Sequence, residues 1–196
     1  MTMDNFVDEK ILLTLRDKDI FPETSPDVAN ITWHDRIVCK VVLLDEKNNI
    51  ALIGNKVHDL FLLPGGGLED GEGLRDGAKR ECREETGCEI EILGDLGMTE
   101  DYRTRESRHS VNYAYLAKVR SLGEPSLTEK EKDIGLYTRW VALETAVHLL
   151  VSQEERIRRG EVEYYNTCFN AIRDAFFVRK SFSSIARPIP SFREFS

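Results

Sequence analysis

The sequence has no long run of apolar residues. In its 196 residues no stretch approaches the roughly 20 apolar residues that cross a membrane. The opening segment, MTMDNFVDEK, contains neither the basic part nor the apolar part of a signal peptide. We therefore expect a cytoplasmic protein with no membrane partner.

Cysteine is scarce, and its spacing forms no metal-binding or redox motif. The chain has four cysteines and no CxxC pair, and each cysteine lies in a segment with the pattern of a helix or a strand. They are Cys39, Cys82, Cys88 and Cys168. This arrangement favours buried, reduced thiols over a disulfide framework or a zinc site.

Positive charge is in the minority. The chain has 27 Lys and Arg against 35 Asp and Glu, a net charge of -8 at pH 7, and no basic helix-turn-helix pattern stands out. A nucleic-acid partner is therefore not expected, and an anionic ligand must be met by a local group of positive charges or by a metal ion. The phosphate-binding motifs GxGxxG and GxxxxGK[ST] are also missing, which argues against a doubly wound nucleotide-binding fold.

Short strand-like segments alternate with helical ones. The pattern predicts strands over 36–45, 50–53, 60–63, 90–93 and 111–119 and one ending near 140–141, with helices over 74–86 and 143–151. Hydrophobic residues make up 41% of the chain, which is enough for a core. This order of elements is typical of an α/β or α+β fold on a mixed sheet.

Both ends of the chain extend beyond this region. Residues 1–33 form an N-terminal extension in which the apolar run 11–15 is expected to add an edge strand, followed by a loop with Pro22 and Pro26. Residues 153–196 contain an amphipathic helix with apolar positions from Val162 to Phe176, and an irregular tail is expected after Lys180. This helix either packs on its own domain or builds a homodimer.

The predicted helix at 74–86 gathers three carboxylates on one face. At about 100° per residue, Glu81, Glu84 and Glu85 share one sector, and Gly77 leaves room above it. Neighbouring carboxylates repel one another unless a cation neutralises them, and hard oxygen ligands favour Mg²⁺ or Mn²⁺ over zinc. A solvated face with a salt bridge from Arg80 to Glu84 is the alternative interpretation.

Seven residues between positions 66 and 88 stand at a particular spacing. They are Gly66, Glu72, Arg80, Glu81, Glu84, Glu85 and Gly87. This spacing resembles the signature of the Nudix hydrolase family, Gx5Ex7REUxEExGU, in which U is an aliphatic residue. Cys82 and Cys88 stand at the two aliphatic positions and are small and apolar enough to pack there.

The resemblance implies an α/β/α sandwich around a mixed sheet, with the Nudix domain over residues 34–152. It also implies a Mg²⁺-dependent or Mn²⁺-dependent pyrophosphohydrolase that cleaves a nucleoside diphosphate linked to another group, such as a nucleoside triphosphate or a nucleotide sugar. By match of position, the metal ligands would be Glu81, Glu84, Glu85 and the backbone carbonyl of Gly65. Arg80 and Glu72 would orient these acids.

Two roles lie outside the signature. In the family, the base that activates water is a glutamate of the motif or an acid on a later loop, and we select Glu131, in the polar segment before Trp140. Arg103 and Arg105 are candidates for contact with substrate phosphates. A nucleotide-sensing or interaction module without turnover is the second hypothesis, and the complete set of acids favours the enzyme.

Overall fold

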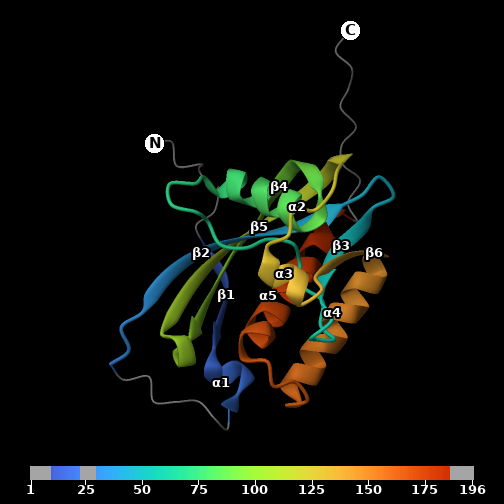
Figure 1. Cartoon of the computed structure of the whole chain (residues 1–196). Helices are drawn as coiled ribbons and strands as arrows, with labels where there is room; N and C mark the ends of the chain where they lie inside the picture. Colours follow the sequence, from blue (N-terminus) through green and yellow to red (C-terminus); the bar gives the residue numbers. More distant parts are fainter. Residues whose placement is uncertain (1–9, 23–29, 186–196) are drawn as a thin grey trace.

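The structure is a computed structural model that describes residues 10–22 and 30–185. Its sheet has six strands in the order β1-β4-β5-β2-β3-β6 (Figure 1). The strands are β1 (Ile11–Arg16), β2 (His34–Leu44), β3 (Asn49–Gly54), β4 (Cys88–Arg103), β5 (Arg108–Leu122) and β6 (Tyr137–Ala142). The helices are α1 (Asp17–Ile20), α2 (Leu74–Thr86), α3 (Glu129–Asp133), α4 (Leu143–Arg158) and α5 (Tyr165–Ile185), with a 3-10 turn η2 at Thr104–Glu106.

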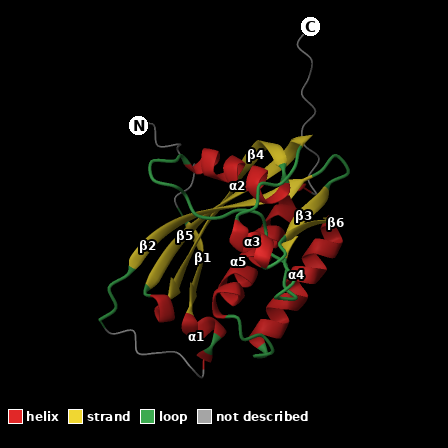
Figure 2. Ribbon diagram, viewed as in Figure 1, coloured by secondary structure: helices red, strands yellow, loops and turns green. Residues whose placement is uncertain are grey.

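Helices cover both faces of this sheet (Figure 2). The central strand β2 shows why, because its side chains from Val38 to Leu44 are buried on both sides of the sheet. Val41 and Leu43 belong to the same hydrophobic cluster as Ala78 and Cys82 of α2. Their neighbours Val42 and Leu44 belong instead to a cluster formed with α4 and α5. This arrangement confirms the predicted α/β/α sandwich.

The strand pairing confirms two local predictions. β2 and β3 pair antiparallel as the predicted hairpin, whereas β2 and β5 pair parallel. The predicted edge strand is β1, which pairs parallel with β4 at the end of the sheet. The sheet is therefore mixed, with its two longest strands, β4 and β5, running antiparallel to one another.

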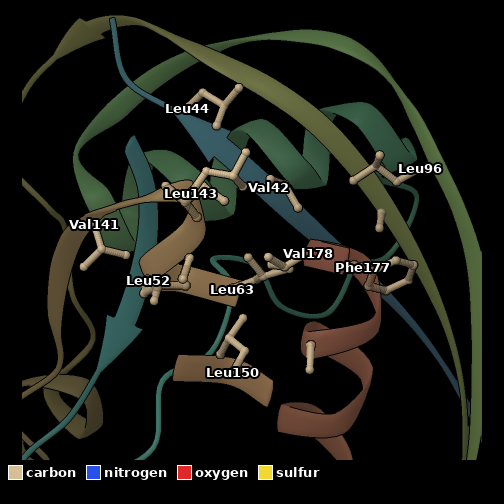
Figure 3. Close-up of a cluster of buried hydrophobic side chains, with 14 residues drawn as sticks. Val42, Leu44, Leu52, Leu63, Leu96, Val141, Leu143, Leu150, Phe177 and Val178 are labelled. Carbon is tan, nitrogen blue, oxygen red and sulfur yellow. The ribbon is translucent and has the colours of Figure 1, made fainter. Parts of the chain in front are cut away.

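The larger apolar cluster lies between the sheet and the helices α4 and α5 (Figure 3). Leu63, Leu150 and Phe177 are among its large side chains that are at most 1% exposed. Leu63 is followed by Pro64 and then by the three glycines at 65–67, which form the glycine-rich loop. The core therefore anchors the N-terminal end of the loop in which the sequence predicts functional residues.

The segment 60–63 does not form the predicted strand. It makes only one isolated bridge, between Leu62 and Ile53. Instead, the N–H of Phe61 donates to the Gln153 side chain at 2.7 Å, and the N–H of Leu63 donates to the Asp174 carboxylate at 2.9 Å. Side chains of α4 and α5 therefore take the place of a neighbouring strand, which a local sequence pattern cannot reveal.

Some element boundaries also differ from the prediction. β4 and β5 are much longer than expected, since Gly94 and Gly97 are accommodated at irregularities of the β4–β5 pairing rather than ending the strand. The chain after Lys180 is not irregular at once, because α5 continues to Ile185. The predicted domain boundary at residue 152 falls inside α4. Pro26, Pro188 and Pro190 lie outside the described residues.

All four cysteines are buried and free, as predicted. In the part of the chain that the structure describes, no helix is both long enough and apolar enough to span a membrane.

Candidate active site

The glycine-rich segment turns sharply against strand β2. Gly65 has a φ of +124°, and a Cβ built at this position would lie 2.1 Å from the carbonyl oxygen of Cys39. The N–H of Cys39 donates to the Gly66 carbonyl at 2.9 Å, and the N–H of Leu68 donates to the Ile37 carbonyl at 3.1 Å. Only glycine permits this conformation and this approach, so the loop is held flat against the sheet.

Helix α2 has an apolar face that packs into the core and another face that carries the acids. Ala78 and Cys82 pack into the core, and Gly87 ends the helix in the left-handed conformation. Gly77 provides the expected space, since a Cβ there would lie 2.2 Å from Leu68 Cδ2 and 3.0 Å from Glu72 Oε2. The missing side chain therefore lets the preceding loop, with Glu72, close over the helix.

Arg80 connects the loop to the helix. Its guanidinium donates to both carboxylate oxygens of Glu72 at 2.8 and 2.9 Å. It also donates to Glu81 at 2.9 Å, to Glu84 at 3.0 Å and to the Gly67 carbonyl at 3.0 Å. The hydrogen bond from Arg80 holds the pKa of Glu72 below its ordinary value. Arg80 thus contacts Glu72, Glu81 and Glu84, whereas Glu85 is not among its partners.

Glu85 faces a different set of groups. Its carboxylate accepts a hydrogen bond from the Gly65 N–H at 2.7 Å. Burial raises the pKa of Glu85 to about 7, against the opposing effect of the Lys40 charge, and burial also raises the pKa of Glu81. Lys40 itself donates to the Gly65 carbonyl at 2.7 Å. The negative charges of Glu81 and Glu85 are therefore incompletely compensated by the surrounding protein.

These donors match a hard divalent cation in chemistry. Within the described residues, however, no three Asp, Glu, His or Cys side chains lie together closely enough to hold a metal ion. The hydrogen bonds explain why these carboxylates lie apart. Arg80 donates to Glu81 and Glu84, whereas the Gly65 N–H donates to Glu85. The Gly65 carbonyl bonds Lys40 and keeps a second lone pair. Oxygen donors with surplus negative charge favour Mg²⁺ or Mn²⁺.

Glu131 lies on the short helix α3 rather than in the predicted loop. Its carboxylate accepts hydrogen bonds from the Thr128 N–H at 2.7 Å and the Thr128 hydroxyl at 2.8 Å, as part of a capping box. Its charge is also one of the causes that raise the Glu85 pKa. The Glu131 charge therefore acts on Glu85.

The two arginines predicted to bind substrate lie in different places. Arg103 is 3% exposed, and its Nε donates to Asp101 at 2.6 Å. It lines a cavity of about 270 Å³ that also includes the backbone of the glycine-rich loop. Arg105 lies apart from this lining, with its guanidinium over the rings of Phe21 and Tyr165.

Sequence reasoning missed the α5 side of this cavity. Asn166, Asn170 and Arg173 line it together with Arg103, which lies more than 60 residues earlier in the chain. A signal was present, because these three polar residues stand at i, i+4 and i+7 beside the apolar stripe of the same helix. The apolar stripe alone carried a prediction for this helix, and the polar stripe carried none.

The sequence pattern of the NUDIX domain family matches residues 33–162. A Bacillus subtilis (strain 168) protein to which 8-oxo-dGTP diphosphatase activity is attributed is 32% identical over 69 residues, which are 35% of this chain and 46% of that protein. A human diphosphoinositol polyphosphate phosphohydrolase is 28% identical over 116 residues, which are 59% of this chain and 61% of that protein. The chain thus spans about half to three fifths of the length of these relatives.

A solved structure shows the same fold. The MutT protein from Methanosarcina mazei Go1 superposes with a TM-score of 0.52 and 19% sequence identity. The superposition covers 79% of this chain and 99% of that one.

Proposed function

Because the chain belongs to the NUDIX domain family, we propose that it is a Mg²⁺-dependent pyrophosphohydrolase that cleaves a nucleoside diphosphate linked to another group. The observation that carries the proposal is the Arg80 network, which sets Glu72, Glu81 and Glu84 beside the glycine-rich loop. A merely solvated helix face would not hold one guanidinium against three acids and a backbone carbonyl.

The proposed metal ligands are Glu81, Glu84, Glu85 and the Gly65 carbonyl. A bound Mg²⁺ would neutralise charge on the phosphate oxygens around the bond that breaks. Arg80 would orient Glu81 and Glu84 through its two bonds of 2.9 and 3.0 Å, and Glu72 would hold Arg80 in place. Arg80 and Glu72 are therefore proposed as positioning residues.

The reaction also needs a group that accepts a proton from the attacking water. We assign this role to Glu131, because it lies on a separate element and acts electrostatically on Glu85. The water oxygen would form a bond to phosphorus, the anhydride P–O bond would break, and the proton would move to the Glu131 carboxylate. In Glu131→Gln the amide oxygen can still accept the bonds from Thr128, so a fall in kcat with an altered pH profile would report chemistry rather than helix capping.

The experiment measures hydrolysis of nucleoside triphosphates, 8-oxo-dGTP, nucleotide sugars, ADP-ribose, dinucleoside polyphosphates and a diphosphoinositol polyphosphate, with Mg²⁺ or with EDTA. The products identify the bond that breaks. Mg²⁺-dependent cleavage of one anhydride bond is the expected result. A folded protein that binds Mg²⁺ and cleaves none of these compounds would contradict the proposal and favour the sensing module.

A further inference from the structure

The cavity beside the glycine-rich loop is lined by positive charge. Five of its lining residues are cationic and none is acidic. They are Arg36, Lys40, Arg103, Arg108 and Arg173. Two asparagines of α5 complete the polar wall, and the loop backbone from Gly65 to Gly67 forms another side. In a chain with a net charge of -8, such a local excess of positive charge points to an anionic ligand.

Acids outside the lining hold several of these arginines in place. Arg103 bonds Asp101 at 2.6 Å, Arg108 bonds Glu106 at 2.8 Å, and Arg173 bonds Asp174 at 2.8 Å. Of the two other cations, Lys40 donates to the Gly65 carbonyl and lies in the field of Asp174, Glu85 and Glu81, whereas no described carboxylate pairs with Arg36. A phosphate group carries between about one and a half and two negative charges at neutral pH, so its oxygens would pair with the guanidinium groups that line the cavity.

One nitrogen of Arg108 and the whole guanidinium of Arg36 have no partner among the described residues. The Nε of Arg108 is buried and has no hydrogen-bond partner among the described residues. Arg36 forms no hydrogen bond or ion pair with any described residue, and its guanidinium lies over Gly67, where a Cβ would come within 2.7 Å of Nη2. A buried donor without a partner is costly, so the Arg108 side chain is incompletely satisfied, and the exposed Arg36 guanidinium is available to an anion in the cavity.

The residues that line the cavity also argue against a nucleobase as the ligand. No aromatic side chain lines the cavity, and Val38 is its one apolar side chain. A nucleobase would find no ring to stack on, whereas phosphate oxygens would find several guanidinium donors. The side of the cavity formed by α5 consists of Asn166, Asn170 and Arg173. These residues lie beyond the part of the chain that matches the NUDIX domain.

We propose that this cavity binds a phosphate group of the substrate, additional to the diphosphate that is cleaved. The inference rests on the proposed function, because it assumes that the cleaved diphosphate lies at the acids of α2. The additional phosphate group would then lie on the other side of the glycine-rich loop. The loop touches both regions, since Gly66 lines the cavity and a Cβ at Gly66 would lie 2.6 Å from Glu81 Oε1. The group can belong to a linear polyphosphate or to a phosphorylated ring, because both present the same oxygens.

Binding is tested without turnover, by calorimetry in EDTA, with tripolyphosphate as the linear probe and inositol hexakisphosphate as the ring probe. Arg36→Gln and Arg108→Gln should each weaken binding of the tighter probe about tenfold or more. Arg120→Gln is the matched control, because Arg120 lies on β5 with Arg108 but pairs with Glu91 outside the cavity. Melting curves confirm that each variant folds.

The outcomes separate this inference from the proposed function. Binding that the two arginine variants weaken, and that Glu85→Gln and Arg120→Gln retain, supports the cavity even if no compound is hydrolysed. The probe that binds more tightly identifies the source of the phosphate. Absence of binding by both probes, or binding unaffected by both arginine variants, would overturn the inference. With a hydrolysed substrate, Arg36→Gln should raise KM and leave kcat nearly unchanged, and an unchanged KM would also count against the cavity.

Discussion

Gly65 sets the geometry of the candidate site. It combines a φ of +124° with the closest approach of loop to sheet, and its N–H and carbonyl bond Glu85 and Lys40. A side chain at this position would force the loop away from β2 and separate the two regions that the loop connects.

Gly65→Ala should therefore lower the free energy of unfolding by more than about 3 kcal/mol, from backbone strain and the clash with the Cys39 carbonyl. The matched control is Gly71→Ala, where φ is +80° but a Cβ meets nothing within 4 Å. That variant should lose only about 1 kcal/mol. Urea denaturation measures both values. Equal losses would show that the contact with Cys39 is unimportant.

Asp101 and Arg103 form a buried ion pair behind the cavity. Burial raises the pKa of Asp101, but the charge and hydrogen bond of Arg103 outweigh it and leave the pKa below the ordinary value of 3.8. Because the folded state holds the carboxylate ionised, the pair stabilises the protein above this pH. The contribution is lost as the pH falls through the lower pKa of the folded state.

Asp101→Asn should cost about 3 kcal/mol at pH 7, since Arg103 then stays buried without its carboxylate. The difference from the parent protein should persist at pH 5 and shrink below about pH 4. Asp59→Asn, which removes an exposed partner of Arg156, should change stability by less than about 1 kcal/mol. Unfolding curves over this pH range decide the matter, and a pH-independent difference would refute the ionic explanation.

At the scale of elements, local patterns predicted α2 better than the parts around it. The sequence predicted a helix over 74–86, and α2 spans Leu74–Thr86 with Ala78 and Cys82 buried in the core. The contacts of Arg80 with Glu72 could be anticipated from the family signature alone. These contacts depend on the path of the loop that carries Glu72, which packs over Gly77. The hydrophobic periodicity of the sequence does not predict that path.

Helix α5 shows what local patterns leave out. Its apolar stripe indicated a buried helix, and Phe169 and Ile172 are indeed almost fully buried against the protein's own domain. The same helix also supplies Asp174 to the N–H of Leu63 and polar side chains to the cavity. Those roles depend on tertiary contacts over more than 60 residues, so the sequence pattern could not assign them.

Phe177→Ala tests how far α5 supports the domain. Phe177 is 0% exposed in the larger cluster, so its truncation should cost about 3–5 kcal/mol. Phe182→Ala is the control on the same helix, because Phe182 is 39% exposed, and it should cost less than about 1 kcal/mol. Thermal unfolding gives the comparison. Similar, small losses in both variants would mean that α5 is dispensable for stability.

For the whole molecule, most of the order of strands and helices could be predicted from the sequence pattern. The α/β/α sandwich, in contrast, was predicted only from the resemblance to the family signature. Periodicity indicated strands and helices without saying which faces they share. The signature supplied that arrangement, and β2, buried on both sides, confirms it. The cationic cavity could not be predicted, because its arginines come from three strands and one helix that are distant in sequence.

The central claim is that the acids of α2 hold a metal ion and support cleavage of an anhydride bond. It is tested most directly by the Mg²⁺-dependent hydrolysis rate of Glu84→Gln and Glu85→Gln, with Glu89→Gln as the control. Glu89 is an exposed acid that pairs with Arg83 at 3.6 Å outside the network. We predict a loss of at least about a hundredfold in the first two variants, with folding retained, and an unchanged rate in the control. Unchanged rates in both Glu84→Gln and Glu85→Gln would contradict the account.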